Sequence, residues 1–492
     1  VYRTVSRYTY DGSNRVASVT DVLSNTTYVA YDNIGRLQST IRTNSQNVAL
    51  IASYAHDGLD RLTNAAYADG TSEKWRQAPC GCGILTHTDR GGNISTNFYN
   101  ANKQVSKVTT VSPNGTLLAY SEMKYDAAGN VTNTLDRLGY STLSQFDSES
   151  RLVKSTDALG RSTEYRIDSL GRQYLTIFPD GTVSSNVFDS ASRVIETVRL
   201  ASLSSSTSLA SVKSSFDDLG RQVTQTDASG TVTSNAFDWA GRVWRTYNLN
   251  QGTYTESQFD QEGNVVLQIG PVLANASASE IAAATVSNSY DTASRLIVVT
   301  DPEGRSSSYV YDGDWPRQLK YGINSLGHTN EVNYYDAMNG RLLTNISSGV
   351  KTVYLYDNAG QVTNTLFADD SSVINVYDGS RLIQTVSRTG LTNSFGFDEL
   401  GRSVSLTNAL GQITTFAFDA VGNVVTVTNA LNHVMKYDLD LMNRSTVTTL
   451  PDGRASTNAY TALGLQDSKT GAGGVSASYE YEPGGKMTKL ID

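Results

Sequence analysis

The sequence contains few of the residues that mark disulfide-stapled domains, membrane proteins or nucleic-acid-binding proteins. Its 492 residues include 2 cysteines and 8 prolines, and only 18% are Asp, Glu, Lys or Arg. Two cysteines cannot build a disulfide framework. No apolar run approaches the roughly 20 residues that cross a bilayer, so we expect no membrane insertion. The net charge of -9 argues against a nucleic-acid partner, which needs clustered Lys and Arg.

Glycine and tyrosine, in contrast, are plentiful, with 40 and 28 copies, and 39% of the residues are hydrophobic. This composition is neither that of a disordered chain nor rich in the residues that favour helices. It predicts an all-β protein. The length alone suggests about three domains of roughly 150 residues, but an internal repeat overrides that estimate.

An aromatic residue followed by Asp recurs along the chain, and most successive copies are 20 to 22 residues apart. The aromatic members are Tyr10, Tyr31, Tyr125, Phe146, Phe188, Phe216, Phe237, Phe259, Tyr290, Tyr311, Tyr335, Tyr356, Tyr377, Phe397, Phe418 and Tyr437. Degenerate copies fill several gaps and begin at His56, Tyr99, Ile167, Tyr460 and Tyr481. The spacing predicts a single array over residues 1–492 with roughly 23 units.

Each unit contains two turn signals. The first turn follows the aromatic residue, as in Asp32-Asn33-Ile34-Gly35-Arg36, and the second turn comes about ten residues later, as in Asp157-Ala158-Leu159-Gly160. Asp accepts backbone N–H groups one or two residues ahead, and Gly supplies the positive φ that closes a hairpin loop with a bulge. We predict a structural role in the repeat for Tyr31, Asp32, Gly35, Arg36, Tyr125, Asp126, Gly129, Phe237, Asp238, Gly241, Arg242, Tyr356, Asp357, Gly360, Phe397, Asp398, Gly401 and Arg402.

The number and dimensions of the expected strands predict how these tandem β-hairpin repeats are arranged. About 46 strands of about six residues would make a strip roughly 20 Å wide and about 220 Å long. A twisted sheet of that length cannot stay flat. We therefore expect a spiral strip, an open partial shell, in which each turn of the strip lies against the next. Many of the residues at positions that could face inward are Thr, Ser, Asn or Gln, so at least one face of the sheet should be in contact with water.

The aromatic-Asp-x-x-Gly-Arg-(Leu/Val) unit resembles the YD repeat of Rhs proteins, teneurins and the shell-forming components of insecticidal toxin complexes. The resemblance covers nearly the whole chain. It implies a β-strip that forms a hollow shell, often around a toxic C-terminal domain, in a protein that is secreted or displayed at the cell surface. The chain begins in mid-pattern at Val1, and we expect it to be a fragment whose partners are the remaining repeats, core and cargo domain of a longer bacterial protein.

Some family members cleave themselves at an Asp-Pro-x-Gly segment near the end of a conserved core. Here the sole Asp-Pro pair, in Asp301-Pro302-Glu303-Gly304, falls at the second turn of an ordinary repeat. Further repeats follow it. We therefore do not transfer the protease activity to this chain.

The pattern is irregular near residues 75–87, where Trp75 precedes Cys80-Gly81-Cys82 and His87. Three candidate ligands with a Cys-x-Cys spacing do not match a four-ligand zinc site. Free thiols are our first expectation for the two cysteines, and an 11-membered-ring disulfide is the second. Longer loops are predicted near residues 200–210 and 270–284, and the latter could hold one helical turn.

No cluster of residues predicts catalysis, a cofactor or a metal. The four histidines, His56, His87, His328 and His433, stand beside no nucleophile in the manner of a triad. One Asp per turn is too few for the six to eight oxygen ligands of calcium. The Arg that follows Gly should pack over a neighbouring aromatic ring or pair with the turn Asp.

Two functions therefore compete. The first is a structural wall that encloses, displays or delivers another domain, such as a toxin. The alternative is a cell-surface adhesion module that binds carbohydrate or protein through exposed aromatic residues, with Trp75, Trp239 and Trp315 as candidates. In both cases we expect no enzyme activity and an extracellular or cell-surface location.

Overall fold

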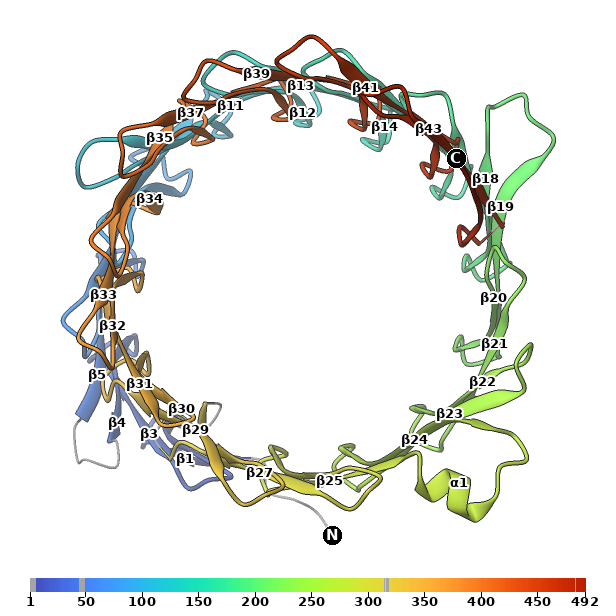
Figure 1. Cartoon of the computed structure of the whole chain (residues 1–492). Helices are drawn as coiled ribbons and strands as arrows, with labels where there is room; N and C mark the ends of the chain where they lie inside the picture. Colours follow the sequence, from blue (N-terminus) through green and yellow to red (C-terminus); the bar gives the residue numbers. More distant parts are fainter. Residues whose placement is uncertain (1–5, 44–48, 314, 316–317, 483) are drawn as a thin grey trace. The chain divides into compact units, whose positions relative to one another are not determined.

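The computed structural model describes residues 6–43, 49–313, 315, 318–482 and 484–492. Within them the chain forms 44 β-strands and one short α-helix (Figure 1). The strands belong to one open antiparallel sheet, and each pairs with its neighbours in the sequence, as β21 does with β20 and β22. The prediction of an all-β array of hairpins is confirmed.

The strands of the first half of the chain end at the predicted turns. They are β1 Ser6–Tyr10, β2 Val16–Asp21, β3 Thr26–Tyr31, β4 Leu37–Thr43, β5 Ala49–His56, β6 Leu62–Ala66, β7 Ser72–Gln77, β8 Ile84–Thr88, β9 Ile94–Tyr99, β10 Val105–Val111, β11 Leu117–Tyr125, β12 Val131–Leu135, β13 Ser141–Phe146, β14 Leu152–Thr156, β15 Ser162–Ile167, β16 Gln173–Ile177, β17 Val183–Phe188, β18 Val194–Leu200, β19 Ser208–Phe216, β20 Gln222–Thr226, β21 Val232–Phe237 and β22 Val243–Asn248.

The second half follows the same plan, with the helix between its second and third strands. Its elements are β23 Thr253–Phe259, β24 Val265–Leu273, α1 Ala278–Ala282, β25 Thr285–Tyr290, β26 Leu296–Thr300, β27 Ser306–Tyr311, β28 Leu319–Ile323, β29 Thr329–Tyr335, β30 Leu342–Ser347, β31 Val350–Tyr356, β32 Val362–Phe367, β33 Ser372–Asp378, β34 Arg381–Val386, β35 Thr392–Phe397, β36 Ser403–Thr407, β37 Ile413–Phe418, β38 Val424–Thr428, β39 Val434–Leu439, β40 Ser445–Thr449, β41 Ala455–Tyr460, β42 Gln466–Thr470, β43 Ser476–Tyr481 and β44 Met487–Ile491.

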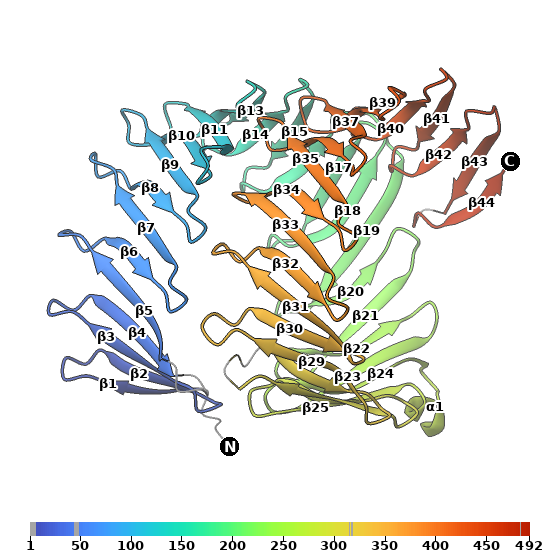
Figure 2. The same ribbon diagram turned by 60° about the vertical axis from the view of Figure 1, so that its left-hand side comes forward.

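The chain divides into two compact units, each assembled from stretches that are far apart in the sequence. Unit 1 comprises residues 1–120, 257–269 and 278–394, and unit 2 comprises residues 121–256, 270–277 and 395–492. In unit 1, Figure 2 shows β5 to β9 and β30 to β34 as two neighbouring rows of hairpins whose turns face one another. The expectation that one stretch of the strip lies against a later one is therefore met inside each unit.

The sheet has almost no conventional core. Among the described residues, the hydrophobic side chains that are buried are Ala65, Ala78, Leu175, Val183, Tyr254, Ile269 and Val272. The accessible surface is 27770 Å², whereas a compact monomer of the same mass would expose about 18,000 Å². Both faces of most strands are thus partly wet, and backbone pairing and polar side-chain contacts replace a central apolar core.

The structure corrects the repeat phase at two places. Tyr437-Asp438 was predicted to open a first turn, but it lies inside β39, and the turn begins at Asp440 because Leu439 occupies the aromatic position. The turn after Tyr377 is also shorter than predicted, since Asp378 pairs directly with Arg381 across a two-residue loop.

The loops are longer at the predicted positions. Residues 201–207 connect β18 to β19, and the loop after β24 carries α1, which is the single helical turn that the sequence suggested (Figure 1). Among the described residues no helix is both long and apolar enough to cross a membrane.

Glycine is used less uniformly than the sequence motif implies. Gly35 and Gly241 have φ of 94° and 81°, as predicted for the residue that closes the turn. Asp60, Ser150 and Asn443 adopt φ of 63°, 62° and 64° at the same position of other first turns. Asn, Asp and, less readily, Ser can enter this region at moderate cost, so the array tolerates non-glycine residues there.

Candidate functional site: the repeat corners and the seam

The first turn is a corner held by one carboxylate. Asp32 Oδ1 accepts the backbone N–H groups of Ile34 and Arg36 at 3.1 and 2.9 Å, and its Oδ2 accepts Arg36 Nε at 2.7 Å. The Asp32 backbone N–H donates to the Arg36 carbonyl at 2.9 Å. The Asp32 side chain therefore closes the turn, and the Arg36 guanidinium neutralises its charge.

The same corner recurs through the array. Asp238 and Asp398 hold Arg242 and Arg402 in the same way, with carboxylate to Nε distances of 2.7 and 2.6 Å. Where the sequence has no Arg, an amide takes its place, since Asn130 and Gln361 donate from their side chains to Asp126 and Asp357 at 3.0 and 2.9 Å. We propose that these residues stabilise the repeat, a role that mutation can test.

The corner carboxylates of Asp32 and Asp57 are stronger acids than free aspartate. Partial burial pushes the pKa of Asp32 up, but the hydrogen bonds from the Arg36 side chain and backbone outweigh it and lower this pKa to about 2. The Arg61 side-chain hydrogen bond likewise lowers the pKa of Asp57 to about 2. Hydrogen bonds to the ionised form thus keep these two corners charged over the whole physiological range.

The corner arginine also links one repeat to the next. Arg172, Arg221 and Arg402 lie over the rings of Phe188, Phe237 and Phe418, at 4.5, 4.4 and 4.7 Å from the ring centres. Each of these rings belongs to the following repeat. The sequence offered ring stacking and Asp pairing as alternatives, and the structure contains both, because a guanidinium can use its edge and its face at once.

A second link between repeats was not predicted. The hydroxyls of Tyr356 and Tyr460 donate to the carbonyls of Leu342 and Ser445 in the preceding repeat, at 2.8 and 3.0 Å. An Asn two residues before the aromatic position, such as Asn458, donates to the same kind of carbonyl at 3.1 Å. The recurring Asn-x-(Tyr/Phe) spacing is the sequence signal that could have revealed this ladder.

The two rows of hairpins in each unit meet turn against turn, and we call this contact the seam. In unit 1 a second turn meets a first turn at three places, which are 67–71 with 336–341, 89–93 with 357–361, and 112–116 with 378–381. In unit 2 the pairs are 136–140 with 398–402 and 157–161 with 440–444. Contacting residues are 262 to 282 positions apart in the sequence. Successive turns of a meander lie on opposite edges, so the seam joins the second-turn edge of one row to the first-turn edge of the other.

Asp378 makes the densest polar contact of the unit 1 seam. Its Oδ1 accepts hydrogen bonds from Ser112 Oγ at 2.7 Å and Asn114 Nδ2 at 3.2 Å. Arg381, the last residue of the same turn, donates to the Leu118 carbonyl at 2.9 Å. The hydrogen bond from Ser112 is the main cause that lowers the pKa of Asp378.

The turns interdigitate across the seam. In unit 2, Leu159 shares a cleft of about 650 Å³ with two neighbouring first turns that begin at Asp419 and Asp440. Arg161 Nη1 and Asn423 Nδ2 both donate to Asn443 Oδ1, at 2.8 and 2.7 Å.

The unit 1 seam repeats this arrangement with the roles of the turns exchanged. The first turn that contains Ala359 lines a cleft of about 220 Å³ together with the second turns of Gly91 and Asn114. A Cβ added at Gly91 would lie 2.8 Å from the Ala359 Cβ, so the two turns are in close contact.

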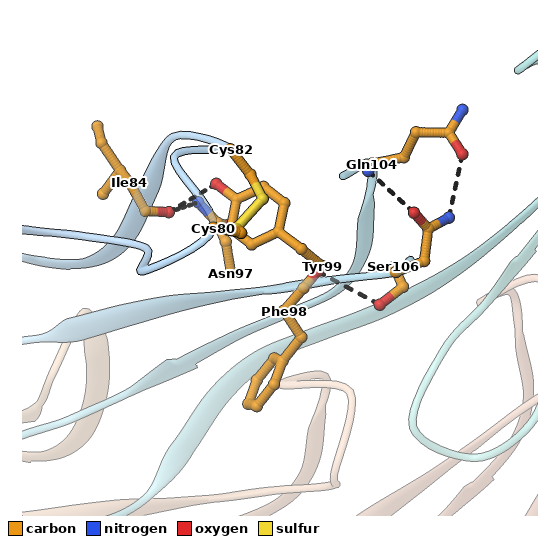
Figure 3. Close-up of a disulfide and its surroundings, with 9 residues drawn as sticks. Cys80, Cys82, Ile84, Asn97, Phe98, Tyr99, Gln104 and Ser106 are labelled. Atoms are coloured by element: carbon orange, nitrogen blue, oxygen red, sulfur yellow. Dashed lines mark hydrogen bonds between the residues drawn. A yellow bond between two sulfur atoms is a disulfide. The ribbon is translucent and has the colours of Figure 1, made fainter. Parts of the chain in front are cut away.

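Cys80 and Cys82 form a disulfide in an exposed turn between β7 and β8 (Figure 3). The preference for free thiols was therefore wrong. Positive φ at Gly81 and Gly83 bends the turn, and the two cysteine Cα atoms lie 5.3 Å apart. Tyr99 closes one side of the loop and donates to the Ile84 carbonyl at 2.8 Å.

The irregular unit also contains a polar cluster. His87 Nε2 and Tyr67 Oη bond to the two oxygens of Glu73, both at 3.0 Å, and the His87 ring stacks on Trp75 at 5.1 Å. His56 lies at the end of β5, and His328 and His433 are the last residues of two exposed second turns. Within the described ranges no three His, Cys, Asp or Glu side chains gather as a metal site would require.

Comparison with known proteins gives two findings. The RHS repeat model matches residues 125–162 and 397–434. No curated protein sequence matches the chain.

Solved structures share the fold at low sequence identity. The crystal structure of TcdB2-TccC3 matches with a TM-score of 0.62 and 13% identity over 99% of this chain and 32% of that chain. The crystal structure of TcdB2-TccC3-TEV gives 0.58 and 13% over 97% and 29%. The Photorhabdus luminescens Tc holotoxin pore gives 0.57 and 13% over 97% and 30%.

The present chain thus spans about a third of the length of the solved chains that it matches. The two sequence matches and the shared fold bear out the resemblance seen in the repeat motif: residues 125–162 and 397–434 match RHS repeats, and the array shares its fold with the Tc toxin chains named above.

Proposed function

We propose that this chain is the structural wall of a larger bacterial protein and that the wall encloses, displays or delivers another domain, such as a toxin. The observation that carries the proposal is the near absence of a core, because a sheet with both faces partly wet is suited to separating two compartments. The regular corners and seam provide rigidity without a globular interior. The shared fold with TcdB2-TccC3 supports the structural part of the proposal.

Electron microscopy of the full-length product of the gene tests this proposal. We expect a curved wall one sheet thick with separate density on its concave side. Limited proteolysis should then cut the domain in that density more slowly than it cuts the same domain expressed alone. A compact filled particle, or equal cleavage rates for the two samples, would contradict the proposal.

The proposed location is extracellular or at the cell surface. Protease added to intact cells, together with immunoblotting of the culture medium, distinguishes this location from the cytoplasm. Detection of the intact protein only after cell lysis would contradict it.

One observation favours the adhesion module as a second candidate. Trp239 sits in the first turn that begins at Asp238, and 95% of its surface is exposed. The other two tryptophans named above are engaged, since Trp75 stacks on His87 and Trp315 Nε1 donates to the Asp336 carbonyl at 3.1 Å. A flat exposed ring suits a sugar face.

A glycan array separates the two functions. The adhesion module predicts binding that is lost in Trp239→Ala and kept in Trp75→Ala. An array without bound glycans would remove support for this candidate and leave the wall.

A further inference from the structure

Two edges of the hairpin rows take no part in the seam, and in unit 2 each of them carries two exposed leucines. These are the first turns of the earlier row and the second turns of the later row. We call the residue two positions after the opening Asp or Asn the tip of the turn. In unit 2 the leucine tips on these edges are Leu170 and Leu219 in first turns and Leu410 and Leu431 in second turns, with exposures of 70, 77, 81 and 72%.

Tips that face the seam are more covered. Leu138 and Leu159, at the same position of their turns, have exposures of 43 and 46%, and Leu400, across the seam, is less exposed still. The backbone geometry is shared, since the N–H groups of both Leu159 and Leu410 donate to the opening side chain at 3.0 Å. The difference therefore comes from the opposite row of turns.

The exposed second-turn edge contains a ready groove. Between the turns 408–412 and 429–433 lies a groove of about 420 Å³, whose lining includes Gln412, Ile413, Asn429, Ala430 and Leu431. No charged residue lines it. Asn408 and Asn429 stand where the second turn 157–161 has Asp157, and Gln412 and His433 stand where it has Arg161.

The unit 1 seam provides a template for what fills such a groove. There the first turn that contains Ala359 contacts the second turn of Gly91 and shares a cleft with it, with the second turn of Asn114 and with the next first turn, at Gly379. In unit 2 the first turns 168–172 and 217–221 present Leu170 and Leu219 on the opposite exposed edge. The chain therefore displays both a groove and the kind of turn that the seam places in such a groove.

We propose that a second copy of this chain docks there, with a first turn tipped by Leu170 or Leu219 inserted between the second turns 408–412 and 429–433. The contact continues the rule of the seam, in which second turns meet first turns. Because the two edges differ, the association is heterologous, and each copy keeps one edge for a further partner. Association then continues beyond the dimer as concentration rises.

Sedimentation velocity of the 492-residue chain over a wide concentration range tests the proposal. We expect the mean mass to increase with concentration past that of a dimer. The double variant Leu410→Asp, Leu431→Asp should lower association at least tenfold, because an aspartate at either tip would be desolvated without a partner. The matched control Leu203→Asp changes an exposed leucine of the loop 201–207, outside both edges, and should associate like the wild type.

A mixing experiment identifies the edges. The variant Leu170→Asp, Leu219→Asp keeps an intact second-turn groove, and the variant Leu410→Asp, Leu431→Asp keeps intact first-turn tips. Each alone should be monomeric, and an equal mixture should form dimers and stop there. Circular dichroism checks that every variant keeps its β-sheet content. A wild type that stays monomeric, or variants that associate like the wild type through strand edges or other contacts, would overturn the proposal.

Discussion

Replacing Gly241 by Val should open the β21–β22 hairpin locally, whereas replacing its neighbour Ala240 should not. Gly241 has φ of 81°, and a Cβ there would meet only Arg221 Nη1, at 4.0 Å. Space is therefore ample, and the cost arises from the backbone. A Cβ in the left-handed region costs about 1–2 kcal/mol, and the branched valine adds to it, so we expect about 2 kcal/mol.

A penalty of about 2 kcal/mol raises the population of the open hairpin about 30-fold. Thermolysin cleavage within residues 232–248 measures this population when opening and closing are fast relative to cleavage. Ala240 is exposed, so Ala240→Val should change the rate by less than about threefold, which corresponds to about 0.5 kcal/mol. Equal cleavage rates for the two variants would refute the assigned corner geometry.

Three further predictions follow from the contacts. Asp32 and Asp57, with pKa near 2, bind protons less readily when folded than when unfolded. The stability that they contribute is therefore complete above about pH 4 and is lost as the pH falls toward 2. The melting temperature followed by circular dichroism should drop over this range, and a melting temperature that does not change with pH would contradict the corner assignment. Tyr356→Phe removes the hydroxyl that donates to the Leu342 carbonyl and should destabilise β30–β32 by about 1 kcal/mol. Amide hydrogen exchange in these strands should then be faster than in the wild type, whereas the variant Tyr334→Phe, which changes an exposed tyrosine, should exchange like the wild type. Arg221→Lys loses both the paired hydrogen bonds to Asp217 and the stacking over Phe237 and should cost about 1 kcal/mol in urea denaturation, an effect that high salt should reduce only in part.

The sequence predicted the local fold well because the signals are local. A corner such as Asp32 to Arg36 contains its own donor, acceptor and positive-φ residue within five positions. The helical turn after β24 was also predictable from its composition. The prediction was wrong where a residue pair near the corner had the sequence of the motif, as Tyr437-Asp438 does two residues before the turn that begins at Asp440.

The seam could not be predicted from the sequence. Ser112 and Asp378 are 266 residues apart, and no local pattern records which turns meet. Their contact depends on the total twist of the sheet over many strands, and a small change in the twist of each strand changes that total greatly. The Cys80–Cys82 bond was likewise open, because its formation depends on the bend that Gly81 and Gly83 impose on the turn.

The central claim is that Asp and Gly corners fold the chain back on itself every ten or eleven residues. Amide hydrogen exchange resolved to single residues tests it most directly. We predict protected runs of five to nine residues that coincide with the strands, protection of the Asp N–H and the closing Gly N–H at each corner, and fast exchange at the tips between them. Long unbroken protected segments, or protected runs out of step with the corners, would contradict the claim.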